Sequence, residues 1–198
     1  MKVLQFFKDE QRDRLTIRSS LYSFIGNLCT ETKLRTKFAE DLGGVVSQVI
    51  KDFKEDVKEQ PFDWKDMVFK AMACFVNLSI EAPAQALFLK EGVLDDVEGL
   101  LTALKSPEEE DRKIIDRIFN FLSKMLRNPE AAAKVLTQKH VVFKTLLYFH
   151  RQFKDGDLQV NALRTLHSLT KLPDFKDTCV NDHKFTLKTF DTYVTEIN

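Results

Sequence analysis

One apolar pattern recurs four times along the chain, at intervals of roughly 44 to 50 residues, and it constrains the fold more than any other feature. Within each copy the apolar residues stand at relative positions 0, 3, 4 and 7, which is one face of an α-helix. The repetition therefore predicts four amphipathic helices with equivalent core stripes. The stripes are Leu21, Phe24, Ile25 and Leu28; Ala71, Cys74, Phe75 and Leu78; Ile118, Phe121, Leu122 and Met125; and Ala162, Thr165, Leu166 and Leu169.

Turn residues divide each interval into a short helix and a medium helix that precede the long one. Gly44 and Gly92 stand where the chain needs a residue that tolerates positive φ. Asn128, before Pro129, is an N-cap candidate. Ser106 with Glu109 resembles a capping box for the third long helix, and Asp63 with Asp66 a less perfect one for the second. Further boundary prolines are Pro83 and Pro173, and the medium helices are expected near 45–58, 93–105, 141–153 and 184–196.

This unit resembles the armadillo repeat, in which a short helix ends in Gly, a second helix follows, and a longer third helix ends in Asn-Leu. The segments FAEDLGGVVSQVI and LFLKEGVLDDVEGLL carry the resemblance, together with the endings Asn27-Leu28 and Asn77-Leu78. The later copies depart from it, because Lys139-His140 and His183 replace the Gly while Lys124 and Ser168 replace the Asn, so they are equally HEAT-like.

The resemblance covers nearly the whole chain and implies an all-α, right-handed α-solenoid of about four armadillo/HEAT-like repeats in a single domain. VLQFFKD at the start and FDTYVTEIN at the end are each expected to be a second helix of a repeat, which suggests a fragment of a longer protein with further domains. The approximate repeats are 1–29 (partial), 30–80, 81–127, 128–171 and 172–198 (partial).

Composition narrows the partners and the compartment. Lys plus Arg and Asp plus Glu both total 30 in 198 residues, so the chain lacks the basic excess that favours nucleic acid as a partner. No window approaches 18 uninterrupted apolar residues, so no membrane-spanning helix is expected. Three widely spaced cysteines without a CxxC pair do not form a disulfide framework. Without an export signal, these features predict a cytoplasmic or nuclear protein.

Enzymatic motifs are missing from the sequence. It contains no Gly-rich phosphate loop, no GxSxG and no HExxH. Cys179 and His183 have a helical spacing, but two ligands do not make a zinc site. Cys29 has no nearby His to activate it, and Cys29 and Cys74 both lie in apolar stretches, as buried thiols do. We therefore expect a non-enzymatic protein without a cofactor.

The outward side of the long helices offers a candidate binding surface. Because armadillo-like proteins bind extended peptides along this concave face, Asn side chains there would bond a peptide backbone, and Lys and Arg would favour acidic or phosphorylated segments of a partner protein. The resemblance is to catenin-type grooves, since the Trp row of nuclear-import receptors is replaced here by Ser23, Ala73, Asn120 and Arg164. The candidate residues are Asn27, Lys70, Asn77, Arg117, Asn120, Lys124, Asn161 and Arg164.

Each of these features also has an interpretation that involves no peptide groove. The same polar side chains are equally explained as a solvated helix face. The chain is alternatively a structural array that acts through its terminal helices, by inter-domain docking or self-association, with no peptide groove. The acidic tract around Glu108–Asp111 is either a second patch or a solvated helix start, the second being favoured. Trp64 is expected in the seam between copies rather than as an exposed anchor.

Overall fold

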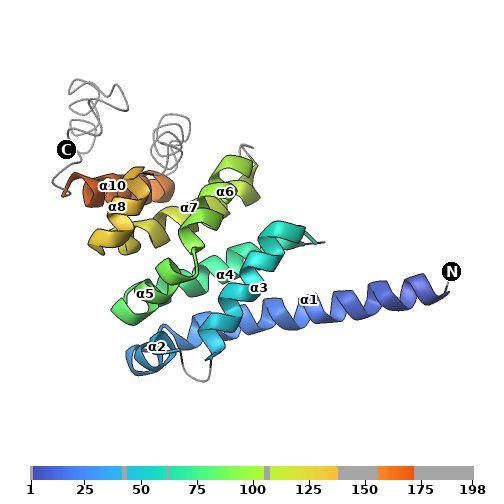
Figure 1. Cartoon of the computed structure of the whole chain (residues 1–198). Coiled ribbons are helices and arrows are strands. Elements are labelled where there is room, and N and C mark those ends of the chain that lie inside the picture. The colour runs from blue at the N-terminus through green and yellow to red at the C-terminus, as the bar shows by residue number, and fades with distance from the viewer. Residues whose placement is uncertain (1, 42–43, 62, 105–107, 138–155, 172–198) are drawn as a thin grey trace.

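The computed structural model describes residues 2–41, 44–61, 63–104, 108–137 and 156–171, and over these ranges the chain is all-α with its helices packed together (Figure 1). This confirms the all-α prediction. The helices are α1 (Lys2–Leu28), α2 (Thr32–Ala39), α3 (Val45–Glu59), α4 (Trp64–Leu78), α5 (Ala82–Lys90), α6 (Val93–Ala103), α7 (Glu109–Met125), α8 (Pro129–Thr137) and α10 (Gly156–Thr170).

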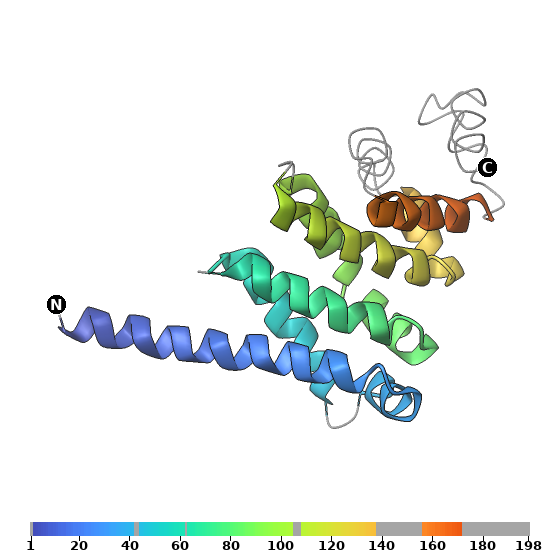
Figure 2. The same ribbon diagram turned by 180° about the vertical axis from the view of Figure 1, so that it is seen from behind.

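The four long helices form one row. From behind, α1, α4, α7 and α10 lie side by side in chain order (Figure 2), and each packs against the next. The remaining helices lie on the other side of this row, with α3 packed against α4 and α6, and α5 packed against α2 and α6. The row therefore positions equivalent faces of successive long helices next to one another.

Most predicted helix boundaries within the described residues are confirmed. Gly44 and Gly92 have φ of 74° and 71° and directly precede α3 and α6. The Asn128 Oδ1 atom accepts hydrogen bonds from the backbone N–H groups of Glu130 and Ala131 and so caps α8. The capping box at Asp63 is wrong, because Asp63 has φ of 60° and its side chain makes no cap bond. Ser106, Pro173 and the medium helices near 141–153 and 184–196 lie outside the described residues.

The prediction for the start of the chain is wrong. VLQFFKD is not a separate second helix, because α1 is one continuous helix from Lys2 to Leu28. The physical reason is in the sequence, which has neither Gly nor Pro between residues 2 and 25 and so offers nothing to end a helix there.

The predicted core stripes are buried in the interior of the row and exposed in part at its first helix. All four stripe residues of α4 and of α7 are fully buried, as are Ala162 and Thr165 of α10. In α1, however, Leu21 is 37% exposed and Phe24 is 60% exposed, whereas Tyr22 and Ile25 are buried. The expectation for Leu21 and Phe24 is therefore wrong, because α1 has a long helix on one side only in the described structure.

Aromatic rings join the row of long helices and the helices that cover it into one core. The Phe75 ring of α4 lies 5.0 Å from that of Phe53 in α3 and 4.9 Å from that of Phe88 in α5, and the Phe88 and Phe121 rings are 5.4 Å apart. Trp64 is half-buried against this core, which confirms its place in the seam. Cys29 and Cys74 are buried free thiols, as expected. None of the described helices combines the length and apolarity needed to cross a bilayer.

Candidate functional site

The last polar row of the long helices joins each helix to the one before it. The Asn77 amide donates to the carbonyl of Gly26 in α1 at 2.9 Å, and the Lys124 ammonium donates to the carbonyl of Val76 in α4 at 2.9 Å. The Ser168 hydroxyl lies 3.3 Å from the carbonyl of Ser123 in α7 and also contacts a carbonyl of its own helix. We call these three contacts between neighbouring long helices the carbonyl rungs.

Each carbonyl rung meets the same physical need. Gly26, Val76 and Ser123 all stand two residues before the last residue of their helix. The last four carbonyls of a helix have no partner within that helix, so a donor from the neighbouring helix satisfies one of them. The position that the sequence analysis assigned to peptide binding thus stabilises the contact between neighbouring long helices.

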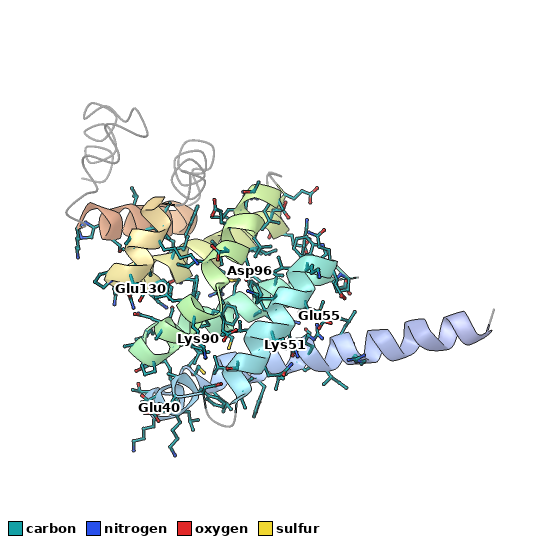
Figure 3. The ribbon with its side chains drawn as sticks, in the orientation of Figure 1. Glu40, Lys51, Glu55, Lys90, Asp96 and Glu130 are labelled. Carbon is teal, nitrogen blue, oxygen red and sulfur yellow. The ribbon has the colours of Figure 1, made fainter. Side chains whose placement is uncertain are left out.

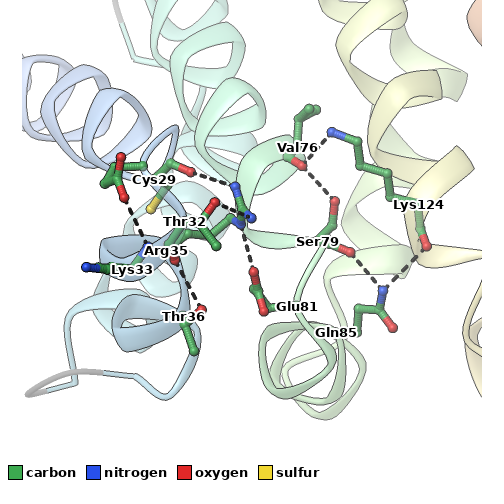
Figure 4. A network of polar contacts seen from close by, with 11 residues as sticks. Cys29, Thr32, Lys33, Arg35, Thr36, Val76, Ser79, Glu81, Gln85 and Lys124 are labelled. Carbon is green, nitrogen blue, oxygen red and sulfur yellow. Dashed lines mark hydrogen bonds and ion pairs between the residues drawn. The ribbon is translucent and has the colours of Figure 1, made fainter.

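A wider polar network ties these helix ends together (Figure 4). Arg35 donates to Glu81 at 2.8 Å and approaches the Cys29 carbonyl at 3.5 Å. The Gln85 amide donates to the Ser79 carbonyl at 2.8 Å and reaches the Lys124 carbonyl at 3.5 Å. The ends of α1, α4 and α7 are therefore fixed relative to one another, which gives any surface built on them a defined shape.

Of the other predicted site residues, some contact side chains of the protein itself and some are exposed to solvent. The Lys70 ammonium donates to the Asp66 carboxylate at 2.7 Å and to the Ser19 hydroxyl at 2.8 Å, so its charge is compensated. The Arg117 guanidinium lies over the Phe69 ring, 5.3 Å from its centroid. Asn161 does not face outward as expected: it is 7% exposed, and its amide donates to Asp116 at 2.7 Å. Asn27 and Arg164 are exposed, and Asn120 is half-buried.

A cleft lies where the end of α7 and the start of α8 meet α10. It has a volume of about 790 Å³, and its lining includes the cations Arg127, Arg164 and Lys171 together with His167. None of its described lining residues is acidic. The rest of the lining is mostly apolar and consists of Ser123, Leu126, Pro129, Val160, Leu163 and Ser168. We call this site the basic cleft.

The pKa of Lys124 responds to the positive charge near the basic cleft. Partial burial lowers its pKa to about 8, and the nearby charges of Arg127, Arg35, Arg117 and Arg164 add to the effect. Two of these arginines, Arg127 and Arg164, line the cleft itself. A negative group bound there would relieve repulsion among like charges, which favours anionic ligands.

Sequence reasoning found Arg164 and Lys124 but missed Arg127, His167 and Lys171. Arg127 and Lys171 occupy equivalent repeat positions, nine residues after Ile118 and Ala162, so one more row would have found both. The spacing of four residues between Asp66 and Lys70 could also have predicted their ion pair on α4, whereas the contact of Lys70 with Ser19 of α1 joins segments 51 residues apart.

The other side of the row carries charges of both signs. Figure 3 labels Glu40, Lys51, Glu55, Lys90, Asp96 and Glu130 there; Glu40 directly follows α2, and the others lie on α3, α5, α6 and α8. The acidic tract at the start of α7 is partly neutralised, since Lys65 lies 2.6 Å from Asp111 and 3.6 Å from Glu108. Neither region carries charges of one sign only, as the described lining of the basic cleft does.

No protein-family model, no curated protein and no solved structure matches the chain. Its function is therefore inferred from the chemistry of its own surface.

Proposed function

We propose that the protein is a non-enzymatic interaction scaffold, a right-handed α-solenoid of armadillo-like repeats that binds an acidic segment of a partner protein in the basic cleft. The observation that carries this proposal is the lining of the cleft, which has three basic side chains and a histidine with no acidic one among its described residues. The row of long helices and the recurring carbonyl rungs support the repeat architecture.

The chemistry of the cleft narrows the ligand. Arg127 and Arg164 offer forked donors that suit carboxylate or phosphate oxygens, and the apolar Leu126, Val160 and Leu163 suit hydrophobic side chains. Val160 is 42% exposed, so apolar surface is accessible there. The preferred segment therefore alternates acidic with apolar residues.

The test is a binding titration by fluorescence anisotropy with a labelled peptide of alternating Glu and Leu. The variant Arg127→Glu/Arg164→Glu/Lys171→Glu reverses three charges of the cleft. The matched control, Lys33→Glu/Lys37→Glu/Lys51→Glu, reverses three exposed charges on α2 and α3 and changes the net charge equally. Circular dichroism checks that both variants keep their helices.

We expect the cleft variant to lose at least about tenfold in affinity while the control keeps the affinity of the wild type within about twofold, because only close charges act strongly through water and salt. A phosphorylated peptide of the same length tests whether phosphate is preferred to carboxylate. Equal losses in both variants would show binding by net charge alone, and binding of a Lys-Leu peptide as strong as that of the Glu-Leu peptide would exclude the acidic ligand.

A further inference from the structure

Two buried thiols meet where α1 packs against α4. Cys29 directly follows the last residue of α1, Cys74 lies in α4, and both side chains are completely buried. The two thiols are free, and a hydrogen bond joins them. Two sulfur atoms from segments far apart in the sequence are therefore already in contact.

Gly26 makes this contact possible. A side chain at Gly26 would begin 3.6 Å from the Cys74 backbone, so the backbones of α1 and α4 come close together there. Cys29 stands three residues after Gly26, and residues three apart lie on the same face of a helix. A disulfide needs its two Cα atoms within about 7 Å of each other, which a backbone approach of this kind supplies.

The surroundings make the two thiols unequal. The hydrogen bond from the Cys74 thiol to the Cys29 sulfur lowers the pKa of Cys29, and the nearby charge of Arg35 lowers it further. Figure 4 shows the Arg35 guanidinium beside Cys29, where it lies 3.5 Å from the carbonyl oxygen. The same hydrogen bond and burial raise the pKa of Cys74. Cys29 is therefore the partner that ionises first, and a thiolate is the nucleophilic form of cysteine.

We propose that Cys29 and Cys74 are a redox-active thiol pair, which hydrogen peroxide oxidises to a reversible disulfide between α1 and α4. The Cys29 thiolate attacks one peroxide oxygen and becomes a sulfenic acid, while the O–O bond breaks and the other oxygen leaves as hydroxide, which takes up the proton of the Cys29 thiol. Cys74 then attacks the Cys29 sulfur, the S–O bond breaks, and the second water leaves with the Cys74 proton. The two sulfur atoms lose two electrons in total, and the peroxide gains them.

The position of Cys29 gives the oxidant a route to the buried pair. Residues 29–31 form the turn between α1 and α2, and the ends of helices open locally at a lower cost than their centres. Hydrogen peroxide is a small molecule and needs only a small opening. Cys74 needs no access to solvent, because it attacks a sulfur that already lies beside it.

The disulfide would join α1 to α4 next to the carbonyl rung between Asn77 and Gly26. It would close a loop of the chain that contains α2 and α3, which restricts the unfolded state. Oxidation would therefore stabilise the first part of the row of long helices.

Oxidation of the reduced protein with hydrogen peroxide tests the proposal. After the remaining thiols are blocked with N-ethylmaleimide, mass spectrometry of proteolytic peptides locates the bond. We expect a peptide pair that joins Cys29 to Cys74, lacks two hydrogen atoms and separates in dithiothreitol. The matched control is Cys179→Ala, which removes the third thiol and should leave this pair unchanged. Oxidation should raise the midpoint of thermal unfolding by at least about 5 °C.

Single variants test the order of the two steps, with circular dichroism to check that each remains helical. Dimedone, added as the protein is unfolded, traps sulfenic acids. Cys74→Ala should accumulate the sulfenic acid at Cys29, whereas Cys74 in the Cys29→Ala variant should react at least about tenfold more slowly.

Three results would contradict the proposal or part of it. Absence of the predicted peptide pair from the folded wild type, or a disulfide to Cys179 in its place, would overturn the proposal. A faster reaction at Cys74 than at Cys29 in the single variants would overturn the role of Cys29 as the attacking thiol. An unfolding midpoint that oxidation leaves unchanged would overturn the stabilising effect.

Discussion

Phe24 and Phe121 stand at the same repeat position in α1 and in α7, yet the first is 60% exposed and the second is completely buried. The sequence pattern around them is the same, with apolar residues at the same spacing. The difference lies in the neighbours: within the described residues, α7 packs against α4 on one side and α10 on the other, whereas α1 packs against α4 on one side only. Repeat position determines which face a side chain is on, and the neighbouring helix determines whether that face is buried.

Truncating these two phenylalanines should give the largest contrast in the molecule. Phe121→Ala removes a ring that contacts Phe75 and Phe88 and leaves a cavity in the core, so it should lower the free energy of unfolding by about 3–5 kcal/mol. Phe24→Ala should lower it by less than about 1 kcal/mol. Urea unfolding in dilute solution measures both. Similar losses would mean that the outer face of α1 is covered within a single copy.

The ion pair that fixes α1 on its inner side should give the next largest effect. Arg18 contacts Asp56, which is 1% exposed, and Glu55 at 2.8 Å, and the Tyr22 hydroxyl also donates to Asp56 at 2.9 Å. Arg18→Met leaves the Asp56 carboxylate without its cation, and we expect a loss of about 3 kcal/mol.

Lys70→Met is the matched control for Arg18→Met, because it breaks an ion pair with Asp66 whose side chains are 33% and 48% exposed. It should cost less than about 0.5 kcal/mol. Thermal unfolding compares the two variants. If Lys70→Met were as costly as Arg18→Met, the burial of Asp56 would not be what makes the Arg18 pair strong.

The apolar pattern was sufficient to predict the helices and most of their buried faces. A period of 3.6 residues is a local property, and so are Gly44, Gly92 and Asn128 as boundary residues. The exposure of Leu21 and Phe24 could not be predicted in this way, because burial on a given side depends on whether another helix lies there. The pattern of α1 alone is indistinguishable from that of an interior helix.

The candidate site was harder to predict because polar side chains have several uses. Lys124 and Asn77 were selected as polar residues on one face, but whether an amide or ammonium bonds a ligand or a neighbouring carbonyl depends on distances of a few ångströms. Lys70 was selected for its charge, although Asp66 stands four residues before it; its second partner, Ser19 of α1, could be found only from the structure. The basic cleft, in turn, is formed by three helices, so its enclosed shape is not a property of any one segment.

The carbonyl rungs allow a smaller comparison between equivalent residues. Asn77→Ala removes the donor to the Gly26 carbonyl and should lower the free energy of unfolding by about 1 kcal/mol. Asn27, at the same position of α1, is exposed, so Asn27→Ala should change it by less than about 0.5 kcal/mol. Urea unfolding again separates the two. A loss confined to Asn27→Ala would indicate that α1, not α4, depends on its row residue.

The smallest effect concerns the pH dependence of stability, and it tests the charge around Lys124. Its pKa in the folded protein is about 8, below the ordinary 10.5, so between these values the unfolded chain binds more protons than the folded one. Stability from this group therefore rises with pH from about 8 to about 10.5, and the penalty for its charge is complete below about 8.

Lys124→Met should remove this rise, so the wild type gains stability relative to the variant as pH increases. Denaturant unfolding at several pH values measures the difference, with Lys113→Met, which removes an exposed cation of α7, as control. If both variants show the same pH dependence, burial among arginines does not govern the proton on Lys124, and the case for a concentrated positive charge beside the basic cleft weakens with it.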